Sequence, residues 1–191
     1  MNNKTRWLTA KRSGATVAFF VAVGSGGLLS CTGEGDGGGG YAAWEDPDTG
    51  LVWQDPTGDQ QSWEEAVDYC DALEIDGQSG WQLPTIDEMR TIVNGCSATE
   101  PGGECQVTDS RNSSTDDWTE ETCQHPCEWM EGPGEGGAYY VDGLHGSAGI
   151  AWSSTPDSSN DDWVWALAFT TGAIDTGETS GVNYMTRCVR D

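Results

Sequence analysis

The spacing of apolar residues predicts two helices near the start of the folded part. Ser62 and Glu65 form a capping box, in which each side chain caps the backbone N–H of the other. The apolar residues that follow at helical spacing are Trp63, Ala66, Val67, Cys70 and Leu73. Thr85 and Glu88 form a second capping box, before a single apolar face of Ile86, Met89, Ile92 and Val93. We therefore expect Cys70 on the buried face of the first helix.

The other apolar runs are short and bounded by turn residues, which predicts strands. One strand is expected at 51–54, and the run 163–169 reads as a central buried strand. Further strands are expected at 150–154, from 173 onward, and at 182–190. The order of one strand, two helices, a long loop region and a meander of strands indicates an α+β fold.

Residues 96–149 have a different composition, rich in Gly, Ser, Thr, Asp and Glu. A loop of this length without secondary structure is uncommon in a compact domain. Its first part contains four cysteines, Cys96, Cys105, Cys123 and Cys127. We expect internal disulfides to hold this segment compact, as a stapled insertion.

The N-terminus predicts an exported lipoprotein. Four cations precede an apolar stretch at 15–29, which is too short for a spanning helix of about 20 apolar residues. The stretch ends in Leu28-Leu29-Ser30-Cys31, which resembles the lipobox of bacterial lipoproteins. We expect a signal peptide at 1–30 and a membrane-anchoring lipid on Cys31; the alternative is ordinary secretion with a chance cysteine.

These boundaries divide the rest of the chain into a tether and one domain. Residues 31–43 form a Gly-rich segment that behaves as a flexible coil, and the domain is expected at 44–191. The expected location is the cell envelope. Thr32 stands where enteric inner-membrane lipoproteins have Asp, which favours the outer membrane or cell surface.

The charge of the chain restricts its partners. The net charge is −24, and removal of the signal peptide leaves four arginines against 32 acidic residues, or −28. Such a surface repels nucleic-acid phosphates, anionic lipid headgroups and heparin-like polymers. We therefore expect no nucleic-acid partner; the simplest reading of the charge is a well-solvated surface.

Seven cysteines are present, and six remain when Cys31 is set aside. An even number in an oxidising compartment predicts three disulfides. The four cysteines of the insertion allow three pairings, and the sequence does not choose among them. A zinc site built on Cys123, His125 and Cys127 is a weaker alternative, because no second ligand pair is evident.

Several motifs follow one another in order over residues 45–191. They include Thr49-Gly50-Leu51-Val52-Trp53-Gln54, Gly80-Trp81-Gln82-Leu83-Pro84-Thr85, Trp152-Ser153-Ser154-Thr155 and Arg187-Cys188-Val189-Arg190. Together these motifs resemble the Lcl C-terminal domain family, also called DUF1566. The family usually has Arg where this chain has Gln82.

The resemblance implies a C-type-lectin-like fold with two helices, an antiparallel sheet and a long disulfide-stapled loop region. It also implies a bridge from the first helix to the last strand, at Cys70 and Cys188. The adhesin that gives the family its name binds sulfated polysaccharides, but the charge of this chain argues against that ligand class.

No catalytic set is evident in the sequence. The only histidines, His125 and His145, lie in the loop region, and no nucleophile elbow or phosphate loop is present. We expect a non-catalytic module that binds a neutral glycan or a protein, with the loop aromatics Trp118 and Trp129 as candidate contacts. The alternatives are an exported enzyme with the cysteine chemistry of formylglycine-generating enzymes, and a purely structural envelope protein.

No cofactor is predicted. A calcium site is a minor alternative, with oxygen ligands from Asp157, Asn160, Asp161 and Asp162 just before the buried strand.

The anchoring hypothesis predicts that Cys31→Ala releases the protein from membranes or leaves an uncleaved precursor, because the acceptor thiol is lost. Fractionation of cells followed by immunoblotting measures this. Unchanged membrane partitioning of the variant would refute the hypothesis.

Overall fold

The computed structural model describes residues 40–191. The expected signal peptide, the lipidation residue Cys31 and most of the tether lie outside the described residues. Within the described part, no helix has the length and apolar character needed to cross a membrane.

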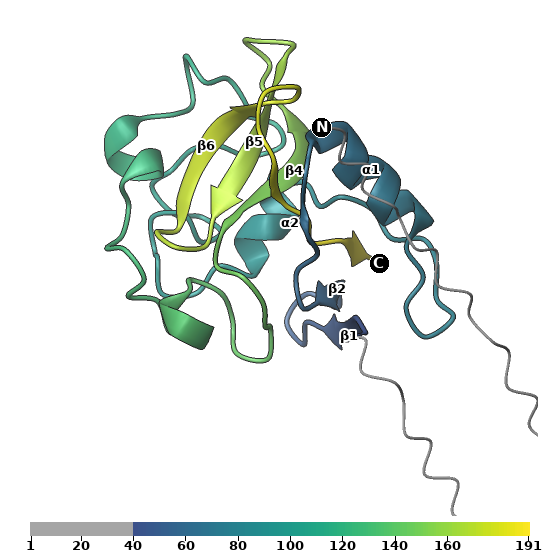
Figure 1. Cartoon of the computed structure of the whole chain (residues 1–191). Helices are drawn as coiled ribbons and strands as arrows, with labels where there is room; N and C mark the ends of the chain where they lie inside the picture. The colour runs from purple at the N-terminus through teal and green to yellow at the C-terminus, as the bar shows by residue number, and fades with distance from the viewer. Residues whose placement is uncertain (1–39) are drawn as a thin grey trace, which may run out of the picture. The chain divides into compact units, whose positions relative to one another are not determined.

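The domain is α+β and contains two sheets (Figure 1). The smaller sheet has the antiparallel order β1 (Ala42–Glu45), β2 (Val52–Asp55), β8 (Val189–Arg190). The larger sheet has the order β3 (Gln60–Gln61), β7 (Tyr184–Met185), β4 (Ile150–Pro156), β5 (Trp163–Ala168), β6 (Ala173–Glu178). Its strands are antiparallel except for the parallel pair β4 and β7.

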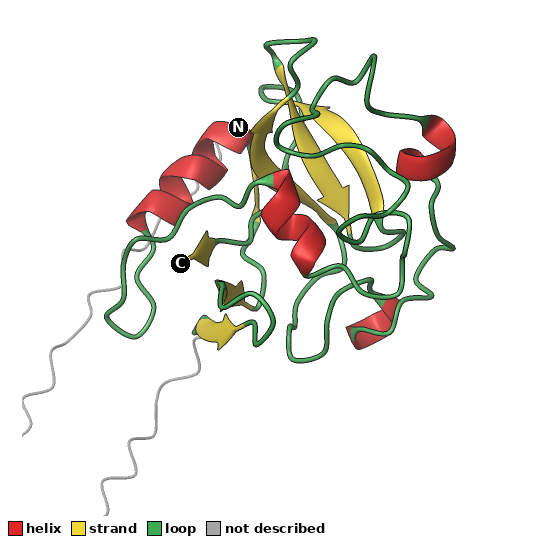
Figure 2. Cartoon of the chain, turned by 180° about the vertical axis from the view of Figure 1, so that it is seen from behind, coloured by secondary structure: helices red, strands yellow, loops and turns green. Residues whose placement is uncertain are grey.

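The two helices pack against opposite faces of the larger sheet (Figure 2). Both α1 (Trp63–Ala72) and α2 (Ile86–Thr91) begin with the predicted capping boxes. Neighbouring residues of a strand point to opposite faces. Accordingly, Ala151 of β4 packs with the α2 cluster, whereas Trp152 packs with the α1 cluster.

The structure differs from the sequence-based prediction at both ends of the domain. Ala42 and Ala43, which we expected in the tether, belong to β1 and pair with Asp55 and Gln54. The single strand expected at 182–190 is two strands, β7 and β8, in different sheets.

The division of that final strand has a physical cause. Between β7 and β8 the chain crosses from one sheet to the other. Its backbone groups there form hydrogen bonds that are not part of the strand pairing in either sheet. The N–H of Thr186 donates to the carbonyl of Asp59 at 3.2 Å, and the N–H of Gln54 donates to the carbonyl of Cys188 at 2.9 Å.

All six cysteines of the described residues form disulfides, which join Cys70 to Cys188, Cys96 to Cys127 and Cys105 to Cys123. The first pairing is the one that the family resemblance implies. The other two select one of the three pairings that the sequence left open. Two short helical turns, η1 (Glu120–Gln124) and η2 (Glu135–Gly137), interrupt the insertion.

We predict that replacing Cys70 and Cys188 by Ala lowers the free energy of unfolding by about 4–5 kcal/mol, because the bridge closes a long loop in the unfolded chain. Its two cysteines are 118 residues apart. Urea titration under non-reducing conditions measures the loss.

The matched control is the Cys105→Ala, Cys123→Ala variant, whose bridge spans only 18 residues. Loop-closure entropy predicts a smaller loss of about 3 kcal/mol for this pair. An equal or larger loss in the control would contradict the loop-closure explanation.

Candidate functional site

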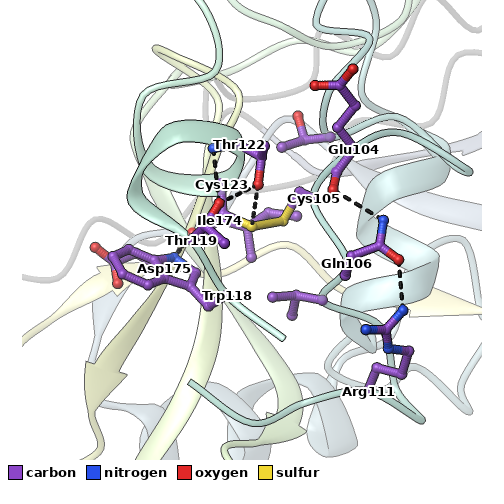
Figure 3. Close-up of a disulfide and its surroundings, with 12 residues drawn as sticks. Glu104, Cys105, Gln106, Arg111, Trp118, Thr119, Thr122, Cys123, Ile174 and Asp175 are labelled. Carbon is purple, nitrogen blue, oxygen red and sulfur yellow. Dashed lines mark hydrogen bonds between the residues drawn. A yellow bond between two sulfur atoms is a disulfide. The ribbon is translucent and has the colours of Figure 1, made fainter. Parts of the chain in front are cut away.

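The insertion is fastened to β6, the edge strand of the larger sheet. The indole Nε1 of Trp118 donates to the carbonyl of Ile174 at 2.9 Å, and the Gln124 amide donates to the Asp175 carboxylate at 2.9 Å. Figure 3 shows Trp118, Ile174 and Asp175 near the bridge from Cys105 to Cys123. Trp118, one of the two predicted contact residues, is therefore partly buried and holds the insertion in place.

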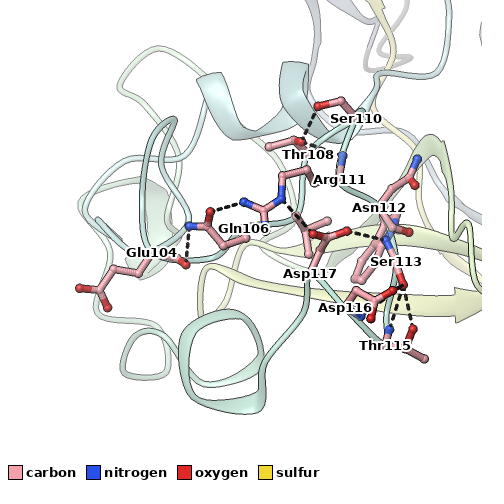
Figure 4. A network of polar contacts seen from close by, with 12 residues as sticks. Glu104, Gln106, Thr108, Ser110, Arg111, Asn112, Ser113, Thr115, Asp116 and Asp117 are labelled. Carbon is pink, nitrogen blue, oxygen red and sulfur yellow. Dashed lines mark hydrogen bonds and ion pairs between the residues drawn. The ribbon is translucent and has the colours of Figure 1, made fainter.

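A polar network stiffens the segment that leads to Trp118 (Figure 4). The guanidinium of Arg111 pairs with Asp117 at 2.9 Å and donates to the side-chain oxygen of Gln106 at 2.6 Å. The second carboxylate oxygen of Asp117 accepts the backbone N–H of Ser113 at 3.2 Å. These bonds connect the two sides of the loop at 106–117.

Trp129, the other predicted contact residue, is 70% exposed and is the most exposed large hydrophobic residue in the described part. Its backbone is nevertheless fixed on both sides. Cys127 is bridged to Cys96, the hydroxyl of Tyr139 donates to the carbonyl of Glu128 at 2.7 Å, and the N–H of Met130 donates to the carbonyl of Thr170 at 2.7 Å. The ring thus projects into solvent from a backbone segment that is held in place by these bonds.

A shallow depression of about 430 Å³ lies beside this ring. Its lining residues are His125, Pro126, Cys127, Glu128, Trp129 and Thr171. The depression combines an aromatic face with an imidazole, a carboxylate and a hydroxyl group. The sulfur of Cys127 is held in a disulfide, so it supplies no thiol. This set of groups suits binding, and we call it the Trp129 depression.

A second polar cluster was not found from the sequence. The two oxygens of Asp55 accept the backbone N–H and the ring Nδ1 of His145, the latter at 2.8 Å. The guanidinium of Arg187 lies 3.7 Å from Asp55 and donates to the carbonyl of His145 at 2.6 Å. Asp55 and His145 are 90 residues apart, so no local pattern reports their contact.

The surroundings of His145 and Arg187 in this cluster shift the pKa of both side chains. Hydrogen bonding to Asp55 raises the pKa of His145, whose side chain is 62% exposed. Burial lowers the pKa of Arg187 to about 10, although Asp55 acts in the opposite direction. The guanidinium remains charged at neutral pH and ties the end of the insertion to β2.

The model of the Lcl C-terminal domain family matches residues 42–190 of the chain. The chain belongs to this family. No curated protein and no solved structure matches it significantly. The Trp129 depression and the Asp55–His145 pair both lie inside the matched region.

Two of the candidate calcium ligands of this Lcl C-terminal domain, Asp157 and Asn160, accept local hydrogen bonds. Burial favours the neutral form of Asp157, but hydrogen bonds from Ser114 and Ser159 outweigh it and lower the pKa of Asp157. The Asn160 side chain accepts the N–H of Asp162 at 3.2 Å. Within residues 40–191, no three His, Cys, Asp or Glu side chains are grouped to hold a metal ion. The structure thus gives no support to calcium here, and both cysteines of the zinc alternative are in disulfides.

We predict that His145 of the Lcl C-terminal domain titrates above the ordinary histidine value of about 6.5, because Asp55 stabilises the imidazolium. The stabilisation of the fold by this pair is complete below pH 6.5 and is lost as the pH rises through the raised pKa. NMR titration of the imidazole signals measures the shift.

Asp55→Asn is the informative variant, since it removes the charge and keeps the size. It should lower the His145 midpoint. An unchanged His145 midpoint in a folded variant would disprove the role of Asp55.

Proposed function

We propose that this protein is a lipid-anchored envelope lipoprotein whose Lcl C-terminal domain is a non-catalytic binding module. The ligand is a glycan or a protein at the cell surface, and the Trp129 depression is the contact site. The observation that carries the proposal is an indole ring that is 70% exposed on a backbone fixed at three neighbouring residues.

An exposed tryptophan on a backbone segment that is held in place is well suited to binding a ligand. The ring offers a large apolar face that stacks on a sugar or fills a pocket in a protein partner. Because disulfide and hydrogen bonds already order the segment, little conformational entropy is lost when a ligand binds. The C-type-lectin-like fold that the resemblance implies agrees with this use.

The two other functions are supported less well. An enzyme of the formylglycine-generating type needs a reactive cysteine pair, and every cysteine of the described residues is bonded in a disulfide. A purely structural role does not explain why a large apolar ring is exposed to solvent on a backbone segment that is held in place. A free-thiol assay on the folded protein tests the first of these alternatives.

We predict that Trp129→Ala abolishes ligand binding without loss of stability, because the ring is exposed. The measurement is a neutral-glycan array and a panel of surface proteins, each probed with and without calcium. Trp163→Ala is the matched control, since Trp163 is also exposed, at 39%, and does not line the depression. Binding that survives Trp129→Ala, or no binding to any ligand, would contradict the proposal.

A further inference from the structure

We propose that the Trp129 depression binds a positively charged side chain, lysine or arginine, carried by a polypeptide partner. This inference rests on the proposed function and narrows its ligand class. The inference is based on the large excess of carboxylates over cations in the domain and on the internal contacts of its arginines.

Within residues 40–191, no arginine or lysine is left without a partner in the fold. Of the 32 acidic residues, all except Glu34 and Asp36 lie in the described part, which holds four arginines and no lysine. Each of these arginines is engaged within the fold. A positively charged ligand therefore meets no unpaired arginine or lysine of the described residues, and His125 is the one basic side chain that lines the depression.

Two of the arginines are buried. The guanidinium of Arg90 donates to three backbone carbonyls, those of Thr99, Val107 and Glu100, at 2.5–2.9 Å. Arg187 donates to the carbonyls of Gln54 and His145.

The other two arginines are nearer the surface but are also paired. Arg111 is bonded to Asp117 and Gln106. Arg190 lies over the ring of Trp81, 5.5 Å from its centroid, and donates to the Gln78 side chain at 3.0 Å.

The depression itself pairs an aromatic face with negative charge. Glu128 lines it, and Glu131 is exposed two residues beyond Trp129. A cation over an indole face is attracted by the ring electrons, and a carboxylate at the rim adds a second attraction. A guanidinium makes both contacts at once, because it is planar and presents a fork of donors to a carboxylate.

Other classes of ligand make fewer favourable interactions with this site. A neutral sugar stacks on the ring and its hydroxyl groups can donate to Glu128, but it gains no charge attraction from the surrounding carboxylates. An anionic glycan is repelled. A small free cation contacts only the depression, whereas a peptide extends beyond it over the acidic surface. Charge complementarity thus favours a basic peptide segment.

The experiment measures binding of a fluorescein-labelled, arginine-rich octapeptide to the oxidised full chain by fluorescence anisotropy. A peptide with citrulline at each arginine position has nearly the same shape and no charge. We expect Trp129→Leu to weaken binding of the arginine peptide about tenfold and Glu128→Gln about threefold. Raising NaCl from 0.05 to 0.5 M should weaken it about tenfold, through screening.

The matched controls are Trp163→Leu and Glu64→Gln, an exposed tryptophan and an exposed glutamate outside the depression. Both should bind like the unaltered chain. Equal affinity of Trp129→Leu and the unaltered chain would overturn the site, since binding would then be spread over the acidic surface. Spermidine competing as well as the peptide would overturn the polypeptide assignment.

The design separates this inference from the proposed function. If neutral glycans or the citrulline peptide bind through Trp129 without salt dependence, the cationic ligand is refuted and the binding module stands. If no ligand of any class depends on Trp129, both proposals are refuted.

Discussion

The buried guanidinium of Arg187 is the interaction on which the arrangement of the domain depends. It is 1% exposed and lies where the chain crosses from β7 to β8. It donates to the carbonyl of Gln54 in β2 at 2.9 Å and to His145 at the end of the insertion. Burying a charge costs several kcal/mol unless its partners are all in place. The two sheets and the end of the insertion must therefore assemble together around this side chain.

That constraint extends to the candidate site through the insertion. The insertion begins at Cys96, a few residues after α2 ends at Thr91, and its far end near His145 is held by Arg187 and Asp55. Between these points, two disulfides and the bond from Trp118 to β6 fix its course. A segment with little regular structure can thus present Trp129 on a backbone that a disulfide and hydrogen bonds hold in place.

The sequence predicted what depends on local pattern. Both helices begin at their capping boxes, because a cap needs only residues three positions apart. The continuous strand at 182–190 was wrong, since the change of sheet is decided by distant partners in β2 and β3. The cysteine pairing in the insertion and the contact of Asp55 with His145 are equally non-local. Trp118 and Trp129 looked alike in sequence, and only the course of the insertion over β6 separates them.

The use of the four arginines links stability to recognition. Carboxylates that outnumber cations so strongly repel one another and weaken the compact state. Three disulfides act against this by constraining the unfolded chain, and the two buried arginines bind the carbonyls of irregular segments where regular ladders are missing. Because the four arginines are bonded to groups of the domain itself, most of the negative charge of the surface carboxylates has no cationic partner. A positively charged partner relieves this repulsion as it binds, which neutral or anionic partners do not. The charge imbalance that the internal cross-links offset therefore also favours the positively charged partner that we propose for Trp129.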